Sequence, residues 1–381
     1  MVIDRNLSIA LFATVVSFST LYVPQPMLPL LAAEFAISPG QAGLLMTVTM
    51  LPLAVAPIFY GYFLQAIPAR LMLQVALSLL AINQVGICFV DEFWTLLLMR
   101  LIQGLLLPAI FTALMTYCAG MVPRDKVRRA MGYYIGATIL GGFSGRLVGG
   151  VFASGFDWHI AFLVIGLLQL IPLWLLRQVD SDADINFARL DARSLLRVFA
   201  NTDYRLMFLA LSCVFFVFSG ILNLIPFRLE AINPSATPFL ISMLYLGYLI
   251  GAPVSFFSDK IAQRIDDHRA GLMLGLLVHA FGLVMLLLVA FKGMLVMMFF
   301  LAAGFFLIHA LLSGLANHLA SEHRGVVNGI YVSVYYFSGA LGSWLPGYFY
   351  AGVGWNGMIF IFVGLLLLSG FSIFRFRPAS K

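Results

Sequence analysis

Apolar runs of about 20 residues recur along the whole chain, and this repetition constrains the fold more than any other feature of the sequence. A helix of about 20 apolar residues crosses the roughly 30 Å hydrocarbon core of a bilayer, because each residue adds about 1.5 Å. We count twelve such runs, centred near residues 20, 50, 80, 105, 140, 167, 218, 247, 280, 306, 338 and 363. Since 62% of the 381 residues are hydrophobic and 10% are charged, no room is left for a soluble domain. The sequence therefore predicts an all-α membrane protein with twelve transmembrane helices.

The basic residues between the apolar runs predict the orientation of the chain. If both termini are cytoplasmic, 18 of the 22 Lys and Arg residues fall on the inner side. Only Arg228 and Lys292 then fall on the outer side, while Arg100 and Arg146 lie within apolar runs. Cytoplasmic loops carry this excess of positive charge in membrane proteins, so we predict cytoplasmic termini. The net charge of +6 is interpreted as this bias, and not as a surface that binds nucleic acid.

Short motifs recur at a nearly constant distance, which indicates an internal duplication. The matching pairs are Phe143–Gly145 with Phe337–Gly339 (offset 194), Gly155–Trp158 with Gly352–Trp355 (offset 197), and Pro29–Glu34 with Pro226–Glu230. Each pair alone is weak, but three pairs in the same order favour two related six-helix bundles. We predict an N-terminal bundle at residues 1–176 and a C-terminal bundle at residues 206–381.

The polar segment between the two bundles, residues 177–205, is expected to be a cytoplasmic loop. Within it, Asp191 can cap a short amphipathic helix that would lie on the inner membrane surface. The apolar face of this helix would consist of Leu195, Leu196, Val198 and Phe199. A tether between moving bundles and an inert linker are both compatible with this pattern.

A glycine-rich stretch with an arginine stands out within the fifth apolar run. Gly141, Gly145 and Gly149 lie on one helix face, where the missing side chains let a neighbouring helix approach closely. Arg146 lies on a different face and needs polar partners, because a guanidinium group in hydrocarbon costs roughly 3 kcal/mol or more. We expect these residues, with Gly150, to serve a conformational change. Plain helix packing, with the arginine reaching up to the headgroups, is the alternative.

Several of these motifs resemble those of the major facilitator superfamily. Leu96, Arg100, Gln103 and Gly104 match the arginine motif of that family's fourth helix. The spacing from Gly141 to Gly150 is similar to the glycine motif of its proton-driven exporters, with Arg146 where many members have proline. The resemblance covers essentially the whole chain and extends to bacterial inner-membrane exporters often labelled arabinose-efflux-like. It implies two pseudo-symmetric six-helix bundles in a bacterial inner membrane.

The resemblance also implies that the first, fourth, seventh and tenth helices line a central cavity. On each of these runs, polar and aromatic residues recur three or four positions apart and therefore share a face, as in small-molecule sites. The candidate substrate-binding residues are Tyr22, Gln25, Arg100, Gln103, Phe216, Asn223, Phe305, His309 and Asn317. Hydrogen bonds that only join helices, worth about 0.6 kcal/mol each, are the alternative interpretation.

The acidic residues are informative because none of the 16 lies in the middle of an apolar run. Many proton antiporters use a mid-membrane carboxylate whose pKa is raised by desolvation. His309 is the candidate replacement, since an unperturbed histidine has a pKa near 6.5, and Arg100 would share its cavity. Carboxylates at helix ends, Glu34 or Glu230, are the alternative proton carriers. Asp259 and Arg264, after the eighth run, are expected to make inner-side contacts that hold one conformation.

The sequence thus predicts a secondary transporter that alternates access and uses the proton gradient to export a small organic molecule. The first alternative is an importer, or an exporter of an anionic metabolite such as a siderophore. The second is a membrane receptor or scaffold that transports nothing. An enzyme is not expected, because the sequence has no nucleophile–base set, metal-ligand cluster or nucleotide loop. We expect a monomer without cofactor or metal, whose partners are the substrate, protons and the lipid bilayer.

Overall fold

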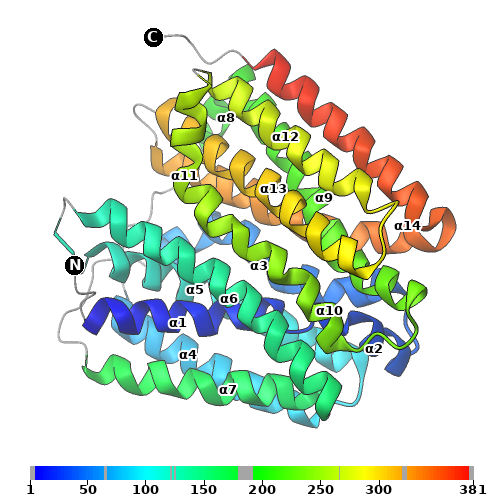
Figure 1. The fold of residues 1–381 in the computed structure, drawn as a ribbon. Helices are drawn as coiled ribbons and strands as arrows, with labels where there is room; N and C mark the ends of the chain where they lie inside the picture. Colours follow the sequence, from blue (N-terminus) through cyan, green and yellow to red (C-terminus); the bar gives the residue numbers. More distant parts are fainter. Residues whose placement is uncertain are drawn as a thin grey trace.

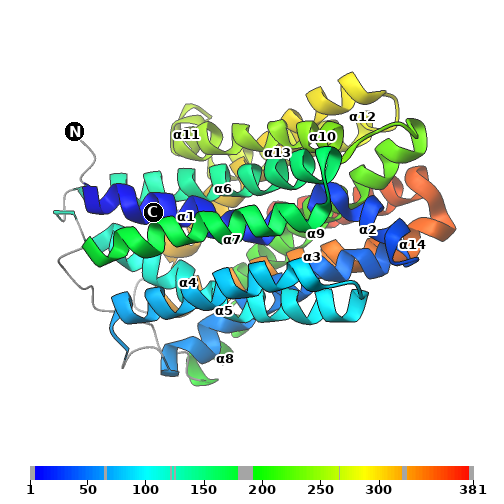
Figure 2. The same cartoon turned by 90° about the horizontal axis from the view of Figure 1, so that it is seen from below.

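The computed structural model describes residues 5–63, 67–120, 122–123, 126–178, 192–265, 267–319 and 324–376. They form two bundles of roughly parallel helices, with both chain ends on the same side of the molecule (Figures 1 and 2). The first bundle contains α1 (Arg5–Tyr22), α2 (Leu28–Glu34), α3 (Pro39–Phe63), α4 (Ala69–Gly86), α5 (Phe93–Gly120), α6 (Val127–Gly155) and α7 (Trp158–Leu175). The second contains α9 (Thr202–Ile232), α10 (Pro238–Leu244), α11 (Gly251–Arg264), α12 (His268–Met285), α13 (Phe291–Leu319) and α14 (Arg324–Arg375).

The predicted number of membrane spans is confirmed once the last helix is divided. Among the described residues, 11 helical segments are long and apolar enough to cross a bilayer. The last of them, Gly325–Arg375, has 51 residues, which is too long for one crossing when about 20 suffice. It bends at Gly354, whose φ of 66° and ψ of −176° are not helical and favour glycine. Counting α14 as two spans gives the twelve that the apolar runs predict.

Two spans contain a break in the α-helix close to the centre of the molecule. The first span passes from α1 through the 3-10 turn Gln25–Met27 into α2, where Pro24 and Pro26 interrupt the helical hydrogen bonds. The eighth span passes from α10 through the 3-10 helix Tyr245–Ile250 into α11. These two breaks carry three of the residues that gather at the site described below.

Each bundle has its own hydrophobic core, and the glycine contacts of one are repeated in the other. A Cβ added at Gly145 would lie 2.2 Å from the carbonyl oxygen of Ser19, and one at Gly342 would lie 2.4 Å from that of Phe216. The glycine and the residue that it contacts are both shifted by 197 residues between the two bundles (145 to 342, 19 to 216). The duplication is therefore visible in the packing. The pair Phe143–Gly145 and Phe337–Gly339 suggests an offset of 194, and this value is wrong by three residues. Three residues are nearly one helical turn, so a shift of this size leaves the packing face almost unchanged.

The two bundles touch closely at the end that lies away from the termini, which we call the distal end. There, a Cβ at Gly150 of α6 would lie 2.5 Å from the Cβ of Ser242 in α10. At the equivalent place in the repeat, a Cβ at Gly347 of α14 would lie 2.7 Å from the backbone of Gly40 in α3. By contrast, a side chain at Gly132, on the Arg146 face of α6 but nearer the termini, would meet no described residue within 4 Å. In this conformation the bundles are joined at the distal end.

Helix α8 (Ala192–Ala200) confirms the short helix expected in the central segment. Val198 is buried, whereas Leu196 and Phe199 are exposed. The proposed cap Asp191 and the side chain of Leu195 lie outside the described residues. The exposed apolar side chains of α8 are compatible with a position on a membrane surface.

Candidate functional site

Arg146 is fully buried at the junction of the two bundles. Its Nε donates a hydrogen bond to Oε1 of Gln25 at 2.5 Å, and its Nη1 donates to the carbonyl oxygen of Gly142 at 2.9 Å. Nη2 is buried and has no hydrogen-bond partner. Arg146 lies nine residues before the end of α6 at Gly155, and its charge is buried inside the protein. The headgroup alternative is therefore wrong, because the side chain turns inward instead of following the helix to the surface.

Three tyrosine rings surround the guanidinium group, and we call them the tyrosine cage. The Cζ atom of Arg146 lies 4.1 Å from the ring centre of Tyr22, 4.6 Å from that of Tyr248 and 4.9 Å from that of Tyr245. Tyr22 belongs to the first bundle, and the other two belong to the 3-10 helix of the second. Cation–π contacts of this kind are worth about 2 kcal/mol or more each when desolvated. The cage therefore binds the two bundles to each other through one cation.

A chain of hydrogen bonds leads from Arg146 into the second bundle. Gln25, which accepts from Arg146, donates through Nε2 to Oδ1 of Asn223 in α9 at 2.8 Å. Asn223 donates in turn to the carbonyl oxygen of Ser219 at 3.1 Å. The hydroxyl of Ser219 lies 2.7 Å from that of Ser343 in α14, at the position that corresponds to Arg146 in the repeat. Tyr22, Gln25 and Asn223, three of the candidate substrate-binding residues, are thus brought together.

The glycines of α6 pack against two different neighbours. Side chains at Gly141 and Gly145 would overlap the backbone of α1, and one at Gly149 that of Val23 just after α1, all within the same bundle. Gly150 instead faces Ser242 in the second bundle. Between these faces, Gly142 leaves room for the rings of Tyr22 and Tyr248. One face of α6 therefore packs within the first bundle, and the Arg146 face meets the second bundle.

Arg100 is also fully buried, but it lies inside the first bundle. Its guanidinium group donates to the carbonyl oxygens of Thr20 at 2.7 Å, Leu21 at 2.8 Å and Leu45 at 3.1 Å. It also donates to Oε1 of Gln103 at 2.6 Å. These bonds tie α5 to α1 and α3, and all the polar nitrogens of Arg100 are used in them. Arg100 is thus bonded within the first bundle, whereas His309 belongs to α13 of the second.

Gln103 extends the Arg100 contacts to two further helices. Its Nε2 donates to Oε1 of Gln84 in α4 at 3.1 Å, and Gln84 donates to the hydroxyl of Thr20 at 3.0 Å. Gln169 of α7 donates to the same hydroxyl at 2.8 Å. All of these side chains are buried. The network joins α1, α4, α5 and α7, and it acts as the polar centre of the first bundle.

His309 lies in the second bundle in an aromatic cluster. The hydroxyl of Tyr331 is 2.9 Å from Nδ1 and donates to the backbone carbonyl of His309 at 3.0 Å. Because that hydroxyl has one hydrogen, Nδ1–H is the donor in the first bond, and Nε2 is the nitrogen that can take up a proton. Phe305 stacks parallel to the imidazole at 5.9 Å, and Tyr335 lies at 4.8 Å. A proton on His309 would therefore face aromatic rings.

The remaining candidates on these helices lie apart from Arg146. Asn317 donates to the carbonyl oxygen of Ser313 and accepts from Asn328 of α14 at 2.8 Å. Phe216 is half-buried and stands edge-on to Phe362 in α14. Its neighbour Phe215 is the one that stacks on Tyr335, at 3.9 Å.

The charged candidates at the helix ends are exposed. Glu34 accepts hydrogen bonds from Nε1 of Trp158 at 2.9 and 3.0 Å, which ties α2 to the start of α7. Glu230 is exposed in the last turn of α9. Asp259 and Arg264 are exposed on α11, at the end of the molecule that carries the termini.

Three tyrosines at the centre, Tyr248, Tyr335 and Tyr336, are the main group that the sequence prediction missed. Tyr248 and Tyr336 lie close enough to the predicted Tyr22 for their hydroxyls to interact, and Tyr335 belongs to the same group. All three belong to the eighth and eleventh spans, on which no polar face was predicted. The spacing of Tyr245 and Tyr248, three residues apart beside a glycine, was the available signal.

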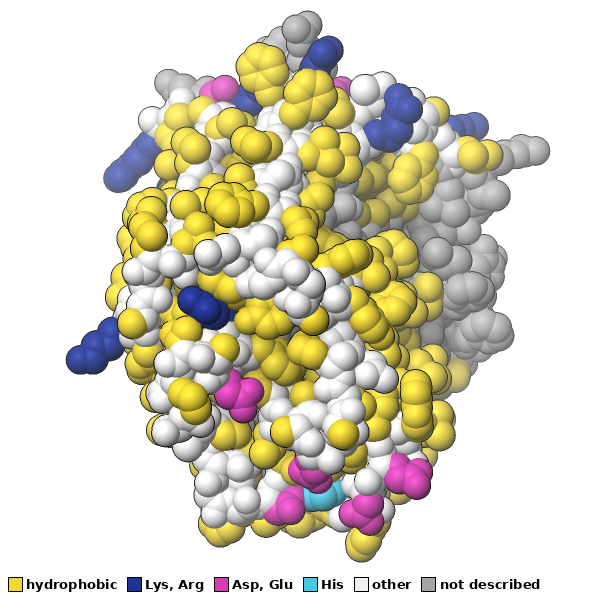
Figure 3. Space-filling view, turned by 90° about the vertical axis from the view of Figure 1, so that its right-hand side faces the viewer, with side chains coloured by type: hydrophobic (Ala, Val, Ile, Leu, Met, Phe, Trp, Pro, Cys, Tyr) yellow, Lys and Arg dark blue, Asp and Glu magenta, His cyan; other side chains and the backbone are white. Residues whose placement is uncertain are grey.

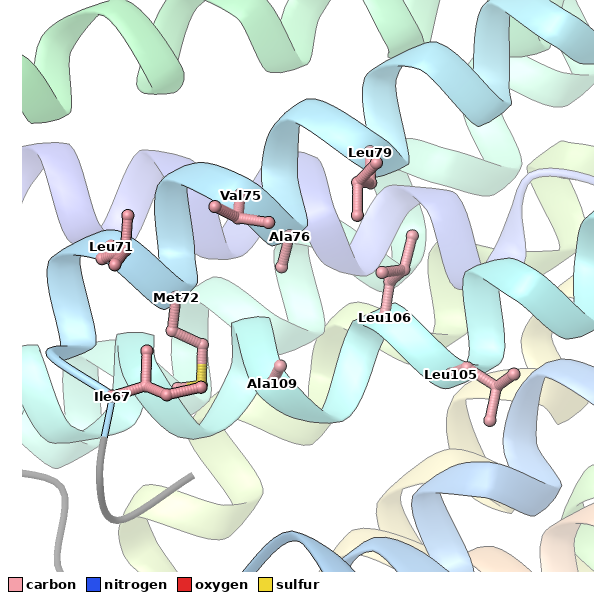
Figure 4. A pocket seen from close by; sticks show the side chains of 9 residues that line it. All are labelled: Ile67, Leu71, Met72, Val75, Ala76, Leu79, Leu105, Leu106 and Ala109. Atoms are coloured by element: carbon pink, nitrogen blue, oxygen red, sulfur yellow. The ribbon is translucent and has the colours of Figure 1, made fainter. Parts of the chain in front are cut away.

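The described part of the chain offers no metal site, and an open groove lies on its side. No three His, Cys, Asp or Glu side chains among the described residues are placed to hold a metal ion. The groove, of about 410 Å³, lies between α4 and α5 and is lined by aliphatic side chains such as Leu71, Val75 and Leu105 (Figure 4). These side chains are largely exposed, as lipid-facing residues of a span are. The groove therefore belongs to the membrane-facing surface.

The chain forms two bundles of six spans, which are repeated in sequence and packing and are joined by polar groups at the centre. This arrangement defines a multi-pass membrane protein of the two-bundle transporter class. Residues 10–343 match the sequence model of the Major Facilitator Superfamily, and the chain belongs to this family of transporters. The resemblance seen in the motifs is thereby confirmed.

Relatives and solved structures agree with this assignment. The chain is 28% identical to the inner membrane transport protein YnfM of Escherichia coli, over 95% of this chain and 88% of YnfM. It is 22% identical to the multi-drug resistance efflux pump PmrA of Streptococcus pneumoniae, over 69% of this chain and 68% of PmrA. The fold is similar to that of a bacterial homologue of the human lysosomal transporter Spinster, solved in an inward-facing and unoccupied conformation. The TM-score is 0.76 at 14% identity, over 97% of this chain and 96% of the other.

Proposed function

We propose that this transporter exports a small organic molecule across a bacterial inner membrane in exchange for protons. The observation that carries the proposal is the one-sided contact between the bundles. Gly150 against Ser242 and Gly347 against Gly40 close the distal end, whereas no described residue lies within 4 Å of a Cβ at Gly132 on the Arg146 face of α6. A protein that alternates access must be able to close at either end, and small contact residues make such closure reversible.

The direction of transport is proposed from charge and from the relatives. Acidic residues at the distal end, Glu34, Asp91, Glu92 and Asp157, are exposed, and Figure 3 shows acidic side chains gathered at the lower edge of this face. Few basic residues are expected at the outer side of a membrane protein, which favours cytoplasmic termini and a conformation open to the cytoplasm. PmrA, named as an efflux pump, favours export. The protein acts as a monomer in this proposal.

His309 is the proposed proton carrier, through the unbonded Nε2. It lies in the second bundle near the central tyrosines, where protonation would place a charge among aromatic rings. Glu34 and Glu230 stay as alternatives at the helix ends. Glu34 has a bond to Trp158 that protonation would weaken, which would link the proton to the distal contacts.

Reconstituted protein tests the proposal. Candidate compounds would be selected by thermal stabilisation of the purified protein, and their flux would be followed in proteoliposomes under an imposed pH gradient. Export coupled to protons predicts that the compound moves against the proton flow, with a pH change of the matching sign in the lumen. Flux in the same direction as the protons would contradict exchange and favour an importer. The absence of flux for every stabilising compound would contradict transport coupled in this way.

A further inference from the structure

We propose that Arg146 binds the anionic group of the transported molecule, so that the central site accepts organic anions and excludes organic cations. This inference rests on the proposed function, because it names the substrate class of the same transporter. It starts from the charge balance at the centre of the two bundles. Arg100 and Arg146 are both fully buried, and an arginine stays protonated inside proteins.

The described chain provides no buried negative charge to balance these two cations. Of the described carboxylates, Asp203 is half-buried at the start of α9, and the other seven are exposed. Arg100 is compensated by three backbone carbonyls and Gln103. Arg146 has one carbonyl, one amide oxygen, the nearby hydroxyl of Tyr248 and the three ring faces of the tyrosine cage. The interior is therefore positive, and a positive interior attracts anions and repels cations.

Arg146 differs from Arg100 in having a free donor. Nη2 carries two N–H groups and makes no hydrogen bond, although it is buried. An unpaired charged donor in a buried place is costly, and the cost is removed when an acceptor arrives. A carboxylate, sulfonate or phosphate oxygen would supply that acceptor, and the bond would be charge-assisted. A cation without an acceptor atom, such as tetraphenylphosphonium, cannot form this bond.

The neighbours of Arg146 would complete an anion site without competing for the anion. The hydroxyl group of Tyr248 is within hydrogen-bond reach of the guanidinium group and of the Tyr22 hydroxyl, and its own O–H can donate to an anion. Gly142 has no side chain, which lets the rings of Tyr22 and Tyr248 and Nη1 of Arg146 lie within 3.4 Å of the position that its Cβ would take. An anion bound at Arg146 would meet donors from both bundles.

The tyrosine cage also explains how an anion would be coupled to the movement of the bundles. Tyr245 and Tyr248 belong to the second bundle, and Arg146 belongs to the first. When the bundles part at the distal end, Arg146 loses two of its three ring contacts, and its charge needs a new partner. An anion that is bound at Arg146 supplies this partner. The protein with a bound anion can therefore open at the distal end, whereas the protein without one is held closed there.

Binding by the purified protein tests this inference. The probes are benzoate, benzenesulfonate and citrate as anions, and tetraphenylphosphonium and ethidium as cations. Their dissociation constants would be measured by thermal shift on the wild type, Arg146→Gln and the control Lys292→Gln, which removes the same charge from an exposed position. We expect at least one anion and neither cation to stabilise the wild type and the control. Arg146→Gln should weaken anion binding about 10- to 100-fold, as expected for a lost charge-assisted hydrogen bond.

Three results would overturn the inference: a cation that binds, an anion that binds Arg146→Gln as tightly as the wild type, or no anion that binds at all. If Arg146→Gln does not fold, Arg146→Lys decides the question. It keeps the charge but loses the planar donor pair, and it should bind anions about 3- to 10-fold more weakly while still excluding cations. Coupled flux of tetraphenylphosphonium would refute the anion inference and leave the proposed transport function intact.

Discussion

Gly150→Ala should open the distal end of the protein without destabilising either bundle. The new Cβ would lie 2.5 Å from the Cβ of Ser242, 2.6 Å from its Oγ and 2.7 Å from the carbonyl oxygen of Pro238. Ordinary contacts begin near 3.4 Å, so α6 and α10 must separate by almost 1 Å. Overpacking of this size raises the free energy of the closed conformation by about 1–3 kcal/mol, and it does not affect the conformation in which the distal end is open. Since about 1.4 kcal/mol changes an equilibrium tenfold, the ratio of closed to open protein should fall by roughly 5- to 150-fold.

Distances between spin labels would report this shift. One pair, Phe156 with Ser235, is exposed at the distal end, and a second pair, Arg129 with Gln263, is exposed at the end near the termini. The native Cys88, Cys118 and Cys213 would first be replaced by serine. In Gly150→Ala the distal distance should lengthen and the other should shorten.

Gly155→Ala is the matched control, because it lies in the same helix and a Cβ there would meet nothing within 4 Å. It should leave both distance distributions as in the wild type. A second comparison is Gly145→Ala, whose Cβ would overlap the backbone of α1 inside one bundle. It should lower the thermal stability in every conformation. If Gly150→Ala keeps the wild-type distances, the closed end is not held by this contact, and the reasoning fails.

Three further substitutions test other parts of the account. His309→Ala should abolish the pH dependence of transport, measured as initial rates in proteoliposomes, while Tyr331→Phe should retain it; full pH dependence in His309→Ala would exclude this residue as the proton carrier. Arg100→Met should lower the free energy of unfolding by at least about 3 kcal/mol, because it leaves three carbonyls and an amide without donors; an unchanged unfolding curve with lost binding would instead place it at the substrate. Asp259→Asn should shift the conformer ratio seen by the same spin labels, and unchanged populations would refute its role in holding one state.

The number of spans and the duplication could be predicted because both depend on patterns that the sequence shows directly. Apolar length alone sets a span, so the twelve runs correspond to helices. The kink at Gly354 follows from a glycine beside the turn that repeats Gly155–Trp158. Motif matching could not fix the offset of the repeat, because a shift of three residues preserves the helix face and only the contacts of Gly145 and Gly342 decide it.

The site was harder to predict, because burial alone does not show which residues meet. Arg100 and Arg146 are both polar residues in apolar runs, yet one is bonded within its own bundle and the other is surrounded by residues of both. Their difference depends on the packing of separate helices, which a single sequence does not contain. Phe215 and Phe216 illustrate the same limit at small scale, since adjacent helical residues point about 100° apart and only one of them reaches the central aromatic rings.

The central claim, that the two bundles separate at the distal end during transport, can be tested with one engineered disulfide. The backbone nitrogen of Phe239 lies 2.7 Å from Oγ of Ser154, across the junction of the bundles, and both residues are exposed. Flux of the compound that stabilises the protein most, whatever its charge, would be measured for Ser154→Cys/Phe239→Cys before and after oxidation. We predict that oxidation stops transport, that reduction restores it, and that each single variant is insensitive to both treatments. An oxidised double variant that still transports at the rate of its reduced form would contradict the account.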